Sequence, residues 1–553
     1  LPAYDAIFDQ AETLAGRLRF FHWELEFPEV FFDRHGRLDD AAGFDAVVGN
    51  PPYVRQERLQ ELKPYLADHF ESYHGVADLY LYFFEQGIEL LCQTGHLGFI
   101  SSGTFAKANF ATSFRKYLPK AAQLKSIIDF GENQPFEGAE MVRPSIVILK
   151  KGQQKNLFRS LFIADKIPES LDAAIAEQGI DCSPRALKQA EWTFQPATMT
   201  ELTEKILKHG VPLSKVVNDE MYRGVLTGFN DAFYIDQDQR DRLVKADSKN
   251  AEILKPLLRG SDLRPWYQQD EGRWLIFTRR GIEINHYPTI REYLEQFRTQ
   301  LEPRPNDWTR RKKWPGRKPG AYEWYEIQDT VAYYQEFEKP KIFWPDIAKL
   351  PRFSWDDDKQ YINNKGYIIP DAHPSLLAIL QSRVIWFAVS QICQPLRLRA
   401  GLWQYQMFTQ FTSRLPIPET TTADREALGE LALQLTEQAN ARYQLHRQSR
   451  HRIQADLGSP DKPLNQKLTA WWALKFGAFR AEIKKVYKRD IALGERDEWE
   501  AWLNDRAAKH RAYTQEIVRL ETLLNARVYA LFDLSPEEIG LIEASTKYRY
   551  GEV

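Results

Sequence analysis

Gly43-Phe44-Asp45-Ala46-Val47-Val48-Gly49-Asn50-Pro51-Pro52-Tyr53-Val54 has the pattern of a short strand that runs directly into a stiff loop. Residues 44–48 are mostly apolar, which is typical of a strand in a buried sheet. Two prolines then end the strand, because proline has no N–H for a sheet and fixes its φ angle. Open α/β sheets bind their ligands at the carboxyl ends of strands. The stretch therefore predicts an α/β fold with Asn50-Pro51-Pro52-Tyr53 at its ligand-binding edge.

The four side chains of this loop suit chemistry on an exocyclic amine of a planar base. The lone pair of such an amine is delocalised into the ring, so acceptors must hold its N–H groups and bend the nitrogen out of plane. The Asn50 side-chain oxygen and the Pro51 carbonyl are two such acceptors, and consecutive prolines fix the direction of that carbonyl. Tyr53 would stack on a base that has left the duplex. The alternative is a stiff turn with a packed tyrosine.

The sequence around this loop alternates short apolar runs with helical stretches, as a sheet with crossover helices does. A helix is expected over residues 77–91, with Gly95 just beyond its end. Strands are expected at residues 44–48, 97–101, 124–130 and 144–150. We therefore expect residues 1–151 to hold part of a Rossmann-like sheet.

The composition of the chain changes three times after this sheet. Residues 152–200 are polar and contain Pro168, Pro184 and Pro196, which indicates a connector with some helix. Residues 201–420 hold most of the tryptophans and short β-rich pieces at 274–278 and 361–369, so we expect a mixed α/β domain. Residues 421–553 are strongly helical, with long amphipathic stretches at 428–446 and 507–531.

Charge, cysteine content and hydropathy narrow the class of protein. The net charge of −2 and the pI near 6.7 give no overall basic character, so a nucleic acid would have to be bound by local patches. Cys92, Cys182 and Cys393 form no Cys-x-x-Cys pair, and the histidines are scattered, so no metal site is expected. The most apolar stretch, residues 376–392, is interrupted by Gln381, Ser382 and Arg383. We expect a soluble, cytoplasmic protein.

Further motifs lie on both sides of the loop. They are Phe20-Phe21-His22-Trp23-Glu24-Leu25-Glu26-Phe27, Gly75-Val76-Ala77-Asp78-Leu79-Tyr80, Gly95-His96-Leu97-Gly98-Phe99-Ile100, and Phe130-Gly131-Glu132 with Phe136-Glu137-Gly138-Ala139. The series resembles the gamma-class N6-adenine DNA methyltransferases of type IIG restriction-modification enzymes. This resemblance implies an enzyme of a restriction-modification or phage-defence system that flips adenine out of double-stranded DNA and methylates N6 with S-adenosylmethionine. It also implies that Phe136 stacks on the target base opposite Tyr53; a buried loop phenylalanine is the alternative.

The cofactor pocket of such enzymes needs a glycine-rich turn, because backbone must approach S-adenosylmethionine closely. No Gly-x-Gly precedes Asn50, and the 49 residues before it are too few for three strands with crossovers, at roughly 30 residues per unit. We therefore expect an upstream methyltransferase or nuclease segment to be missing from this chain, and the chain alone to bind cofactor poorly. By resemblance, Glu24 and Glu26 are candidate cofactor contacts; ordinary surface carboxylates are the alternative.

Two further stretches, residues 221–235 and 254–264, resemble the TaqI-like C-terminal specificity domain that follows this class of methyltransferase. Residues 304–318 carry seven Lys or Arg against one Asp, interleaved with Trp308 and Trp314, which suits phosphate contact and stacking. A solvated charged loop is the alternative. The candidate DNA-binding side chains are Arg310, Arg311, Lys312, Lys313 and Arg317.

Three functional hypotheses follow. The first is site-specific methylation of adenine N6 in duplex DNA. The second is a DNA sequence-recognition fragment without catalysis of its own, which the missing glycine turn favours. The third is protein glutamine N5-methylation, which uses the same tetrapeptide because the planar amide nitrogen must also be bent out of plane. The region of about 350 residues that follows the catalytic region argues against this hypothesis.

Overall fold

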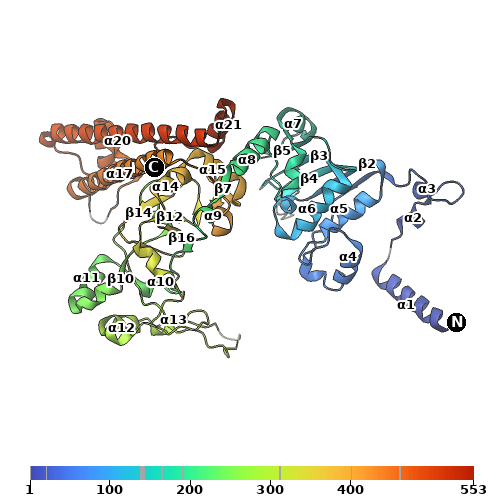
Figure 1. The fold of residues 1–553 in the computed structure, drawn as a ribbon, viewed down its shortest axis with the longest axis horizontal. Helices are drawn as coiled ribbons and strands as arrows, with labels where there is room; N and C mark the ends of the chain where they lie inside the picture. The colour runs from blue at the N-terminus through green and yellow to red at the C-terminus, as the bar shows by residue number, and fades with distance from the viewer. Residues whose placement is uncertain are drawn as a thin grey trace. The chain divides into compact units, whose positions relative to one another are not determined.

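The computed structural model describes residues 2–19, 21–131, 133–136, 143–163, 166–189, 191–309, 313–399, 401–459 and 462–552. It divides into two compact units, Leu1–Leu202 and Thr203–Val553 (Figure 1). The helical residues 421–553 belong to the second unit together with residues 203–420. The finer division into residues 1–151, 152–200, 201–420 and 421–553 stays a prediction.

The first unit is built on a mixed sheet. Within the described residues its strand order is β1-β2-β4-β3-β5-β6. β1 and β2 are parallel, whereas β4 is antiparallel to both β2 and β3. The strands are β1 (Phe44–Gly49), β2 (Leu91–Ser102), β3 (Ala122–Asp129), β4 (Pro144–Lys151), β5 (Phe158–Phe162) and β6 (Ile180–Cys182). The predicted α/β class and all four predicted strands are confirmed.

Two helices pack on this sheet and form its core. α5 (Tyr80–Glu89) contacts β2, and α6 (Thr112–Ala121) contacts β3. α5 lies within the helix predicted over residues 77–91 and is shorter at its start. The rings of Phe84, Phe105 and Phe114 pack against one another at centroid distances of 5.4 to 6.1 Å. This apolar core gives rigid support to the sheet edge at which β1 and β2 end.

Residues 152–200, which were predicted to form a connector with some helix, also extend the sheet. Residues 152–200 contribute β5, β6 and the intervening helix α7 (Leu171–Gln178). β5 runs parallel to β3, and β6 pairs antiparallel with β5. Strands of five and three residues are too short to give a recognisable apolar period. Only the sheet that they join stabilises them.

β1 forms one edge of this sheet. Val48 on this strand is 84% exposed, which is unusual for a β-branched residue in a sheet. At the other end of the strand, Phe44 contacts Trp23 and Phe27 at ring distances of 5.7 and 5.4 Å. Phe21 and Leu25, close to that contact in the sequence, are 54% and 76% exposed. The first unit thus presents apolar surface along an open strand edge.

The second unit contains short strands and helices, as the mixed α/β prediction expected. In its described part the strand orders are β15-β10-β11-β9, β14-β12-β16-β8, β13-β18-β17 and β19-β7. The strands are β7 (Gly210–Pro212), β8 (Tyr222–Arg223), β9 (Tyr234–Ile235), β10 (Leu254–Leu258), β11 (Trp274–Ile276), β12 (Lys341–Pro345), β13 (Ile347–Ala348), β14 (Ser354–Asp356), β15 (Tyr361–Ile362), β16 (Gly366–Pro370), β17 (Pro395–Arg399), β18 (Leu402–Gln406) and β19 (Pro416–Pro418). The pieces predicted at 274–278 and 361–369 correspond to β11, β15 and β16.

The most apolar stretch forms two helices, α14 (Pro374–Gln381) and α15 (Arg383–Ile392), which meet at an angle of 65°. The break is at Ser382, whose hydroxyl accepts the N–H of Ile385 and caps α15. Nearly all residues of both helices are buried inside the unit. In the described residues no single helix is long and apolar enough to cross a membrane.

Long helices dominate the C-terminal region, as predicted. α17 (Thr422–Arg452) and α20 (Arg496–Leu531) pack against each other and extend beyond the predicted stretches 428–446 and 507–531. The shorter helices are α18 (Gln466–Thr469), α19 (Phe476–Tyr487) and α21 (Pro536–Thr546). Leu445, Trp471 and Leu503 lie in a core between these helices.

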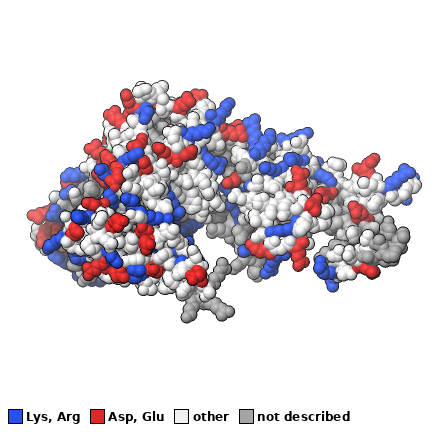
Figure 2. Space-filling model, turned by 60° about the horizontal axis from the view of Figure 1, so that its bottom comes forward, with Lys and Arg blue, Asp and Glu red and all other residues white. Residues whose placement is uncertain are grey.

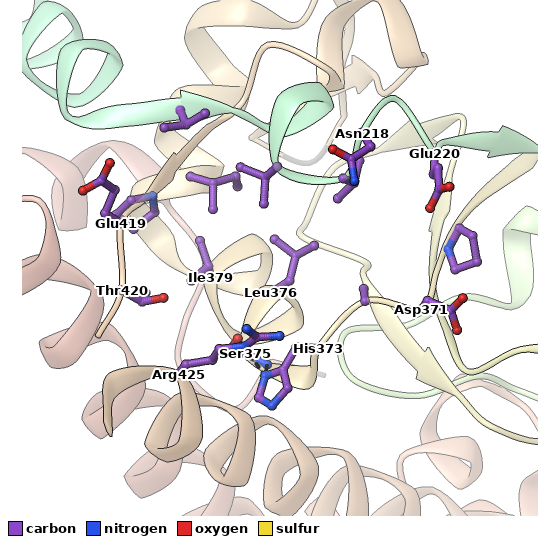
Figure 3. A pocket seen from close by; sticks show the side chains of 17 residues that line it. Asn218, Glu220, Asp371, His373, Ser375, Leu376, Ile379, Glu419, Thr420 and Arg425 are labelled. Carbon is purple, nitrogen blue, oxygen red and sulfur yellow. Dashed lines mark hydrogen bonds between the residues drawn. The ribbon is translucent and has the colours of Figure 1, made fainter. Parts of the chain in front are cut away.

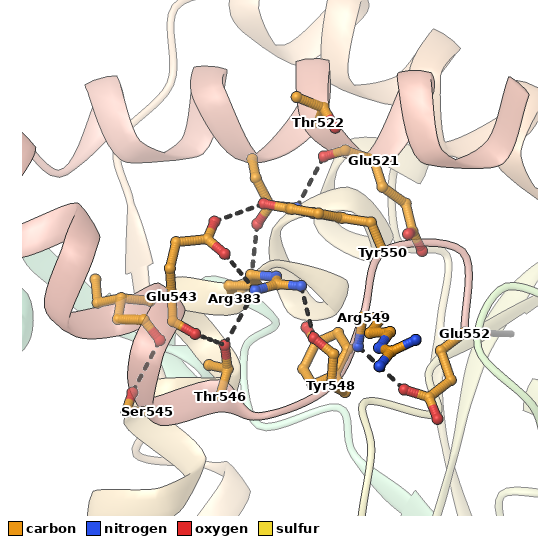
Figure 4. Close-up of polar contacts among 12 residues, drawn as sticks. Arg383, Glu521, Thr522, Glu543, Ser545, Thr546, Tyr548, Arg549, Tyr550 and Glu552 are labelled. Atoms are coloured by element: carbon orange, nitrogen blue, oxygen red, sulfur yellow. Dashed lines mark hydrogen bonds and ion pairs between the residues drawn. The ribbon is translucent and has the colours of Figure 1, made fainter. Parts of the chain in front are cut away.

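The last residues of the chain tie α15, α20 and α21 together (Figure 4). Arg383 forms an ion pair with Glu543, donates to the Tyr548 carbonyl at 2.7 Å, and lies 3.9 Å from the ring of Tyr550. The buried Glu521 of α20 accepts N–H groups from Gly551 at 2.6 Å and from the Trp266 indole at 2.9 Å. Because Trp266 precedes β11, this network also joins the β-rich and helical regions.

A buried histidine pair in the helical region predicts a pH dependence of stability. His446 Nε2 lies 2.9 Å from His510 Nδ1, and both rings stack on Trp472. Burial, together with neighbouring cations, lowers the pKa of His446 to about 3 and that of His510 to about 4. Both are therefore neutral when folded, whereas the unfolded chain binds protons below about pH 6.5.

The free energy of unfolding should thus fall as the pH drops from 6.5 towards 4, by up to about 1.4 kcal/mol per pH unit for each histidine. Urea unfolding at pH 7.5 and pH 5.0 measures this difference. The difference in unfolding free energy between the two pH values should be smaller in the double variant His446→Phe/His510→Phe. It should stay unchanged in His451→Phe, which alters an exposed histidine of α17. An equal pH dependence in all three proteins would contradict the assignment.

Candidate active site and DNA-binding surfaces

The predicted catalytic loop leaves β1 at its carboxyl end, beside β2, where Gly49 is paired with Phe99. Pro51 is buried, whereas Asn50 and Pro52 are exposed and Tyr53 is 43% exposed. The Tyr53 hydroxyl donates a long hydrogen bond of 3.5 Å to the Ile100 carbonyl, and burial raises the pKa of Tyr53 to about 12. The loop is therefore anchored at one proline and accessible at the two side chains that would contact a base.

A second segment holds this loop in place. The N–H of Gln56 donates to the Asp78 carboxylate at 3.3 Å, and the N–H of Leu79 donates to the Val54 carbonyl at 3.0 Å. Partial burial raises the pKa of Asp78. The motif that contains Asp78 was visible in the sequence, but its contact with the catalytic loop was not, because the two are separated by a turn and a helix.

Tyr80, Ser102 and Thr104 form the wall behind Tyr53. Tyr80 is 1% exposed, and its ring centroid lies 6.0 Å from that of Tyr53. Its hydroxyl lies 3.5 Å from the Thr104 hydroxyl, which is 2.8 Å from the Ser102 hydroxyl. Gly103 lies between them in close contact with β4, since a Cβ there would lie 2.2 Å from the Ser145 hydroxyl and would force that hydroxyl to turn away. Sequence reasoning missed this wall.

Phe136 emerges at the same edge of the sheet as Asn50. Its loop joins β3 to β4, and β4 begins opposite the end of β2, where Pro144 pairs with Ser102. Arg143 and Asp129 close the base of the loop with an ion pair of 3.0 Å. Phe136 is 42% exposed, so the alternative of a buried loop phenylalanine is wrong. Two exposed aromatic rings, Tyr53 and Phe136, therefore belong to loops at one sheet edge.

Lys107 is a further cation at this edge, and no sequence motif had singled it out. It follows the segment containing Thr104, and burial lowers the pKa of its ammonium group. Arg143 lowers that pKa further, whereas Glu191 and Asp129 oppose the change. A poorly solvated cation next to a binding loop is suited to an anionic ligand.

Glu24 and Glu26 lie away from this edge. Both are exposed on the short helix α2 (Trp23–Glu26). Trp23 of the same helix packs on Phe44, the first residue of β1, whereas Asn50 follows the last. The described contacts therefore place the two carboxylates near the opposite end of β1 from the catalytic loop.

The basic segment of residues 304–318 is described only in part, because Arg310, Arg311 and Lys312 lie outside the described residues. Lys313 is exposed. Trp308 and Trp314 pack edge to face with ring centroids 4.7 Å apart. A cavity of about 500 Å³ is lined by these two rings together with Arg304, Lys313, Gly316, Arg317 and Lys318. The combination of cations and indoles predicted for this segment thus surrounds a concave surface.

A DNA contact at Arg317 is wrong. Only 4% of this residue is exposed, and its guanidinium donates to five backbone carbonyls, those of Leu301, Thr227, Glu326, Glu323 and Trp324. Burial lowers the pKa of Arg317 to about 10, which still leaves it charged at neutral pH. Its donors are fully used inside the protein, so none is available to a phosphate.

The hairpin of β17 and β18 is a second exposed element of the same region. Its register pairs Arg397 with Gln404 and Arg399 with Leu402, so both arginines lie on one face. Arg397 donates to the Gln404 side chain at 3.0 Å. Every residue of β17 after Pro395 is exposed. Two-stranded ribbons fit the major groove of DNA, and Arg and Gln side chains hydrogen-bond to guanine and adenine there.

A larger cavity, of about 550 Å³, lies elsewhere in the second unit (Figure 3). Apolar side chains such as Leu376 and Ile379 form much of its wall, with His373 and Arg425 close together at one side. None of the candidate catalytic or DNA-binding residues lines it. It is therefore separate from the sites described above.

Comparison with known protein families agrees with this arrangement. Residues 3–136 match the Eco57I restriction-modification methylase family, and residues 255–407 match the TaqI-like C-terminal specificity domain. The chain carries an Eco57I-type methylase domain and a TaqI-like specificity domain. The residues matched to the methylase include the loop of Asn50 and end at Phe136, and those matched to the specificity domain include Lys313 and the β17–β18 hairpin. Residues 421–528 match a domain of unknown function (DUF8810).

Individual relatives are type II methyltransferases. M.BstVI of Geobacillus stearothermophilus is 27% identical over 416 residues, which cover 70% of each chain. M.XhoI of Xanthomonas vasicola is 27% identical over 430 residues, or 73% of this chain and 74% of the relative. The solved structure of the type IIL restriction-modification enzyme MmeI in complex with DNA aligns with a TM-score of 0.48 at 12% identity, over 91% of this chain and 57% of the MmeI chain.

Proposed function

We propose that this protein is the amine-binding and sequence-reading part of a site-specific DNA methyltransferase that acts on adenine N6 in a restriction-modification system. The observation that carries the proposal is the accessible loop of Asn50 and Tyr53 at the end of β1, with Phe136 at the same edge. The methylase and specificity families matched by the same chain support it. Residues 1–151 would bind the base, and residues 201–420 would read the DNA.

In this proposal the loop acts on the amine through two acceptors. The Asn50 side-chain oxygen and the Pro51 carbonyl each accept one N–H, which directs the nitrogen lone pair away from the ring. The buried Pro51 ring keeps the carbonyl fixed while the amine changes shape. A neutral amine held by these two acceptors needs no general base, because its proton leaves after the nitrogen–methyl bond has formed.

The free-energy cost of moving the adenine out of the duplex is offset by stacking of the base on aromatic rings of the protein. Tyr53, supported by Tyr80 behind it, would cover one face of the base, and Phe136 would contact it from the neighbouring loop. Each such stack contributes about 1–3 kcal/mol. The Tyr53 hydroxyl is uncharged at neutral pH, as a phenol with an ordinary pKa near 10 also is, so it does not repel DNA phosphates.

S-adenosylmethionine would supply the methyl group, but the described residues do not form a complete pocket for it. They offer two acceptors and aromatic rings, whereas the glycine-rich turn that its amino-acid part needs is absent among them. The open edge of β1, with Val48 84% exposed, supports an additional polypeptide segment beside it. We propose that this segment holds the cofactor; direct contacts from Glu24 or Glu26 would require it to reach across β1.

DNA would be bound by the specificity domain. Lys313 and the adjacent Arg310, Arg311 and Lys312 would contact phosphates, with Trp308 and Trp314 lining the cavity beside them. Arg397, Arg399 and Gln404 of the exposed hairpin would contact base edges.

Incubation with plasmid DNA and S-adenosylmethionine, followed by mass spectrometry of the nucleosides, tests the proposal. The chain alone should bind duplex DNA in a gel shift without methylating it. N6-methyladenine should form only after a glycine-rich methyltransferase segment is supplied. DNA binding without N6-methyladenine in the supplemented reaction would favour the recognition-fragment hypothesis. Formation of N5-methylglutamine in an added protein would favour the hypothesis of protein glutamine methylation.

A further inference from the structure

A strongly basic segment lies in the helical region, outside the methylase and specificity domains. Residues 462–489 contain eight Lys or Arg and one acid, Glu482, in a chain whose net charge is −2. Residues 304–318 of the specificity domain form another such basic run, whereas Figure 2 shows blue and red side chains interspersed over the visible face. The charge of this segment is therefore a local feature and no consequence of overall composition.

The segment is held on a rigid support. α19 inserts Phe479, Ile483 and Val486 into a core shared with Trp471 and Leu503. Glu482, 9% exposed on its side chain, accepts from Asn465 at 2.6 Å and lies 3.7 Å from both Lys467 and Lys485. The buried side of the helix is thus fixed by packing and by its single carboxylate.

The opposite side of α19 is exposed and free of large apolar groups. Gly477, Ala478 and Ala481 lie on it at helical spacing, and nothing lies within 4 Å of a Cβ built on Gly477. Lys484 and Lys485 lie on this side, and Lys475 and Lys488 flank the two ends of the helix; all four are exposed, and we name them together the α19 lysine face. In the described part of the chain, no ion pair engages Lys475, Lys484 or Lys488.

We propose that the α19 lysine face binds the phosphate backbone of duplex DNA. This inference rests on the proposed DNA methyltransferase function and assigns part of that DNA contact to the region of unknown function. The helix rises about 1.5 Å per residue, so the lysines at its two ends span roughly 20 Å, several phosphates along a strand. The small residues Gly477, Ala478 and Ala481, which lie between these lysines, allow the DNA backbone to approach the helix closely.

The chemistry of the face favours duplex DNA over the other common polyanions. Membrane binding is strengthened by large apolar side chains that enter the lipid, and single-stranded nucleic acid by aromatic rings on which bases stack, and the exposed side of α19 has neither. Phe479 instead points into the core. Stabilisation of the helix dipole explains lysines at the C-terminal end of α19, but not Lys475 before its first turn.

The test measures binding of the full chain to a 40-base-pair duplex over a range of salt concentrations. The triple variant Lys484→Gln/Lys485→Gln/Lys488→Gln should make the slope of log K against log salt less negative by about 0.9 per lysine removed. The matched control, Lys509→Gln/Arg511→Gln/Arg519→Gln, removes the same charge from exposed positions of α20, where Lys509 and Arg519 already pair with Asp505 and Glu516. Its slope should stay close to that of the parent chain.

Lysine acetylation footprinting gives a second readout that requires no substitution. Bound duplex should protect Lys484, Lys485 and Lys488 and leave Lys509 reactive. Equal slopes for the triple variant and the control, together with unprotected lysines, would overturn the assignment. So would binding to phosphatidylserine vesicles that the triple variant loses while DNA binding is unchanged. Failure of the parent chain to bind DNA at all would instead overturn the proposed function and this inference together.

Discussion

Asn50→Ala should lower the rate of methylation by about 10²–10³-fold in the enzyme supplied with its cofactor-binding segment, while DNA binding stays unchanged. The substitution removes one of the two acceptors for the adenine amine and leaves the Pro51 carbonyl alone. Loss of a single fixed hydrogen-bond partner of a reacting group typically costs about 10²–10³-fold in kcat. Asn50 is exposed and its loop is anchored by Pro51 and Asp78, so the fold should not change. The rate of N6-methyladenine formation measures the loss.

Two companion variants separate chemistry from general damage. Asn109→Ala removes another exposed asparagine of the first unit and should retain full activity. Asn50→Asp keeps an acceptor oxygen at the same position and should retain part of the activity. A gel shift with each protein checks DNA binding. Methylation by Asn50→Ala at the parental rate would refute the role of this side chain.

The sheet of the methylase domain was largely predictable, because its strands end in loops with strong local signals. Prolines after residue 49 end β1 whatever surrounds it, so Asn50 could be placed at a strand's carboxyl end from sequence alone. β5 and β6 could not be found in this way, because strands this short are stabilised by pairing with β3 and with each other. Neither strand is long enough to show the alternation of apolar and polar residues by which a strand is predicted.

The candidate site was only partly predictable for a similar reason. Asn50, Tyr53 and Phe136 belong to motifs, and β2 and β4 bring their loops to one edge. The support given by Asp78 and Tyr80 depends on how the chain after Tyr53 folds back, which no local pattern specifies. In the specificity domain, a run of cations does not distinguish an exposed Lys313 from a buried Arg317, because burial is a property of the tertiary structure.

Arg317→Met should destabilise the second unit by about 3–5 kcal/mol, because it leaves buried carbonyl groups without donors. The guanidinium fills its pocket with hydrogen bonds of 2.7 to 3.2 Å to the five carbonyls, and lies 4.5 Å from the ring of Tyr322. Methionine matches its length and supplies no donor. A loss of this size is a large fraction of the about 5–15 kcal/mol that stabilises a typical domain. Urea unfolding followed by tryptophan fluorescence measures it.

Two controls distinguish this structural role from a DNA contact. Lys318→Met changes the exposed neighbour and should leave the unfolding midpoint nearly unchanged. Arg317→Lys keeps the charge but offers three donors to five carbonyls, so its midpoint should lie between those of Arg317→Met and the parent chain. A DNA-contact role requires the reverse pattern, in which Arg317→Met unfolds like the parent and instead weakens the salt dependence of DNA binding. That pattern would restore Arg317 to the DNA surface and remove it from the core of the specificity domain.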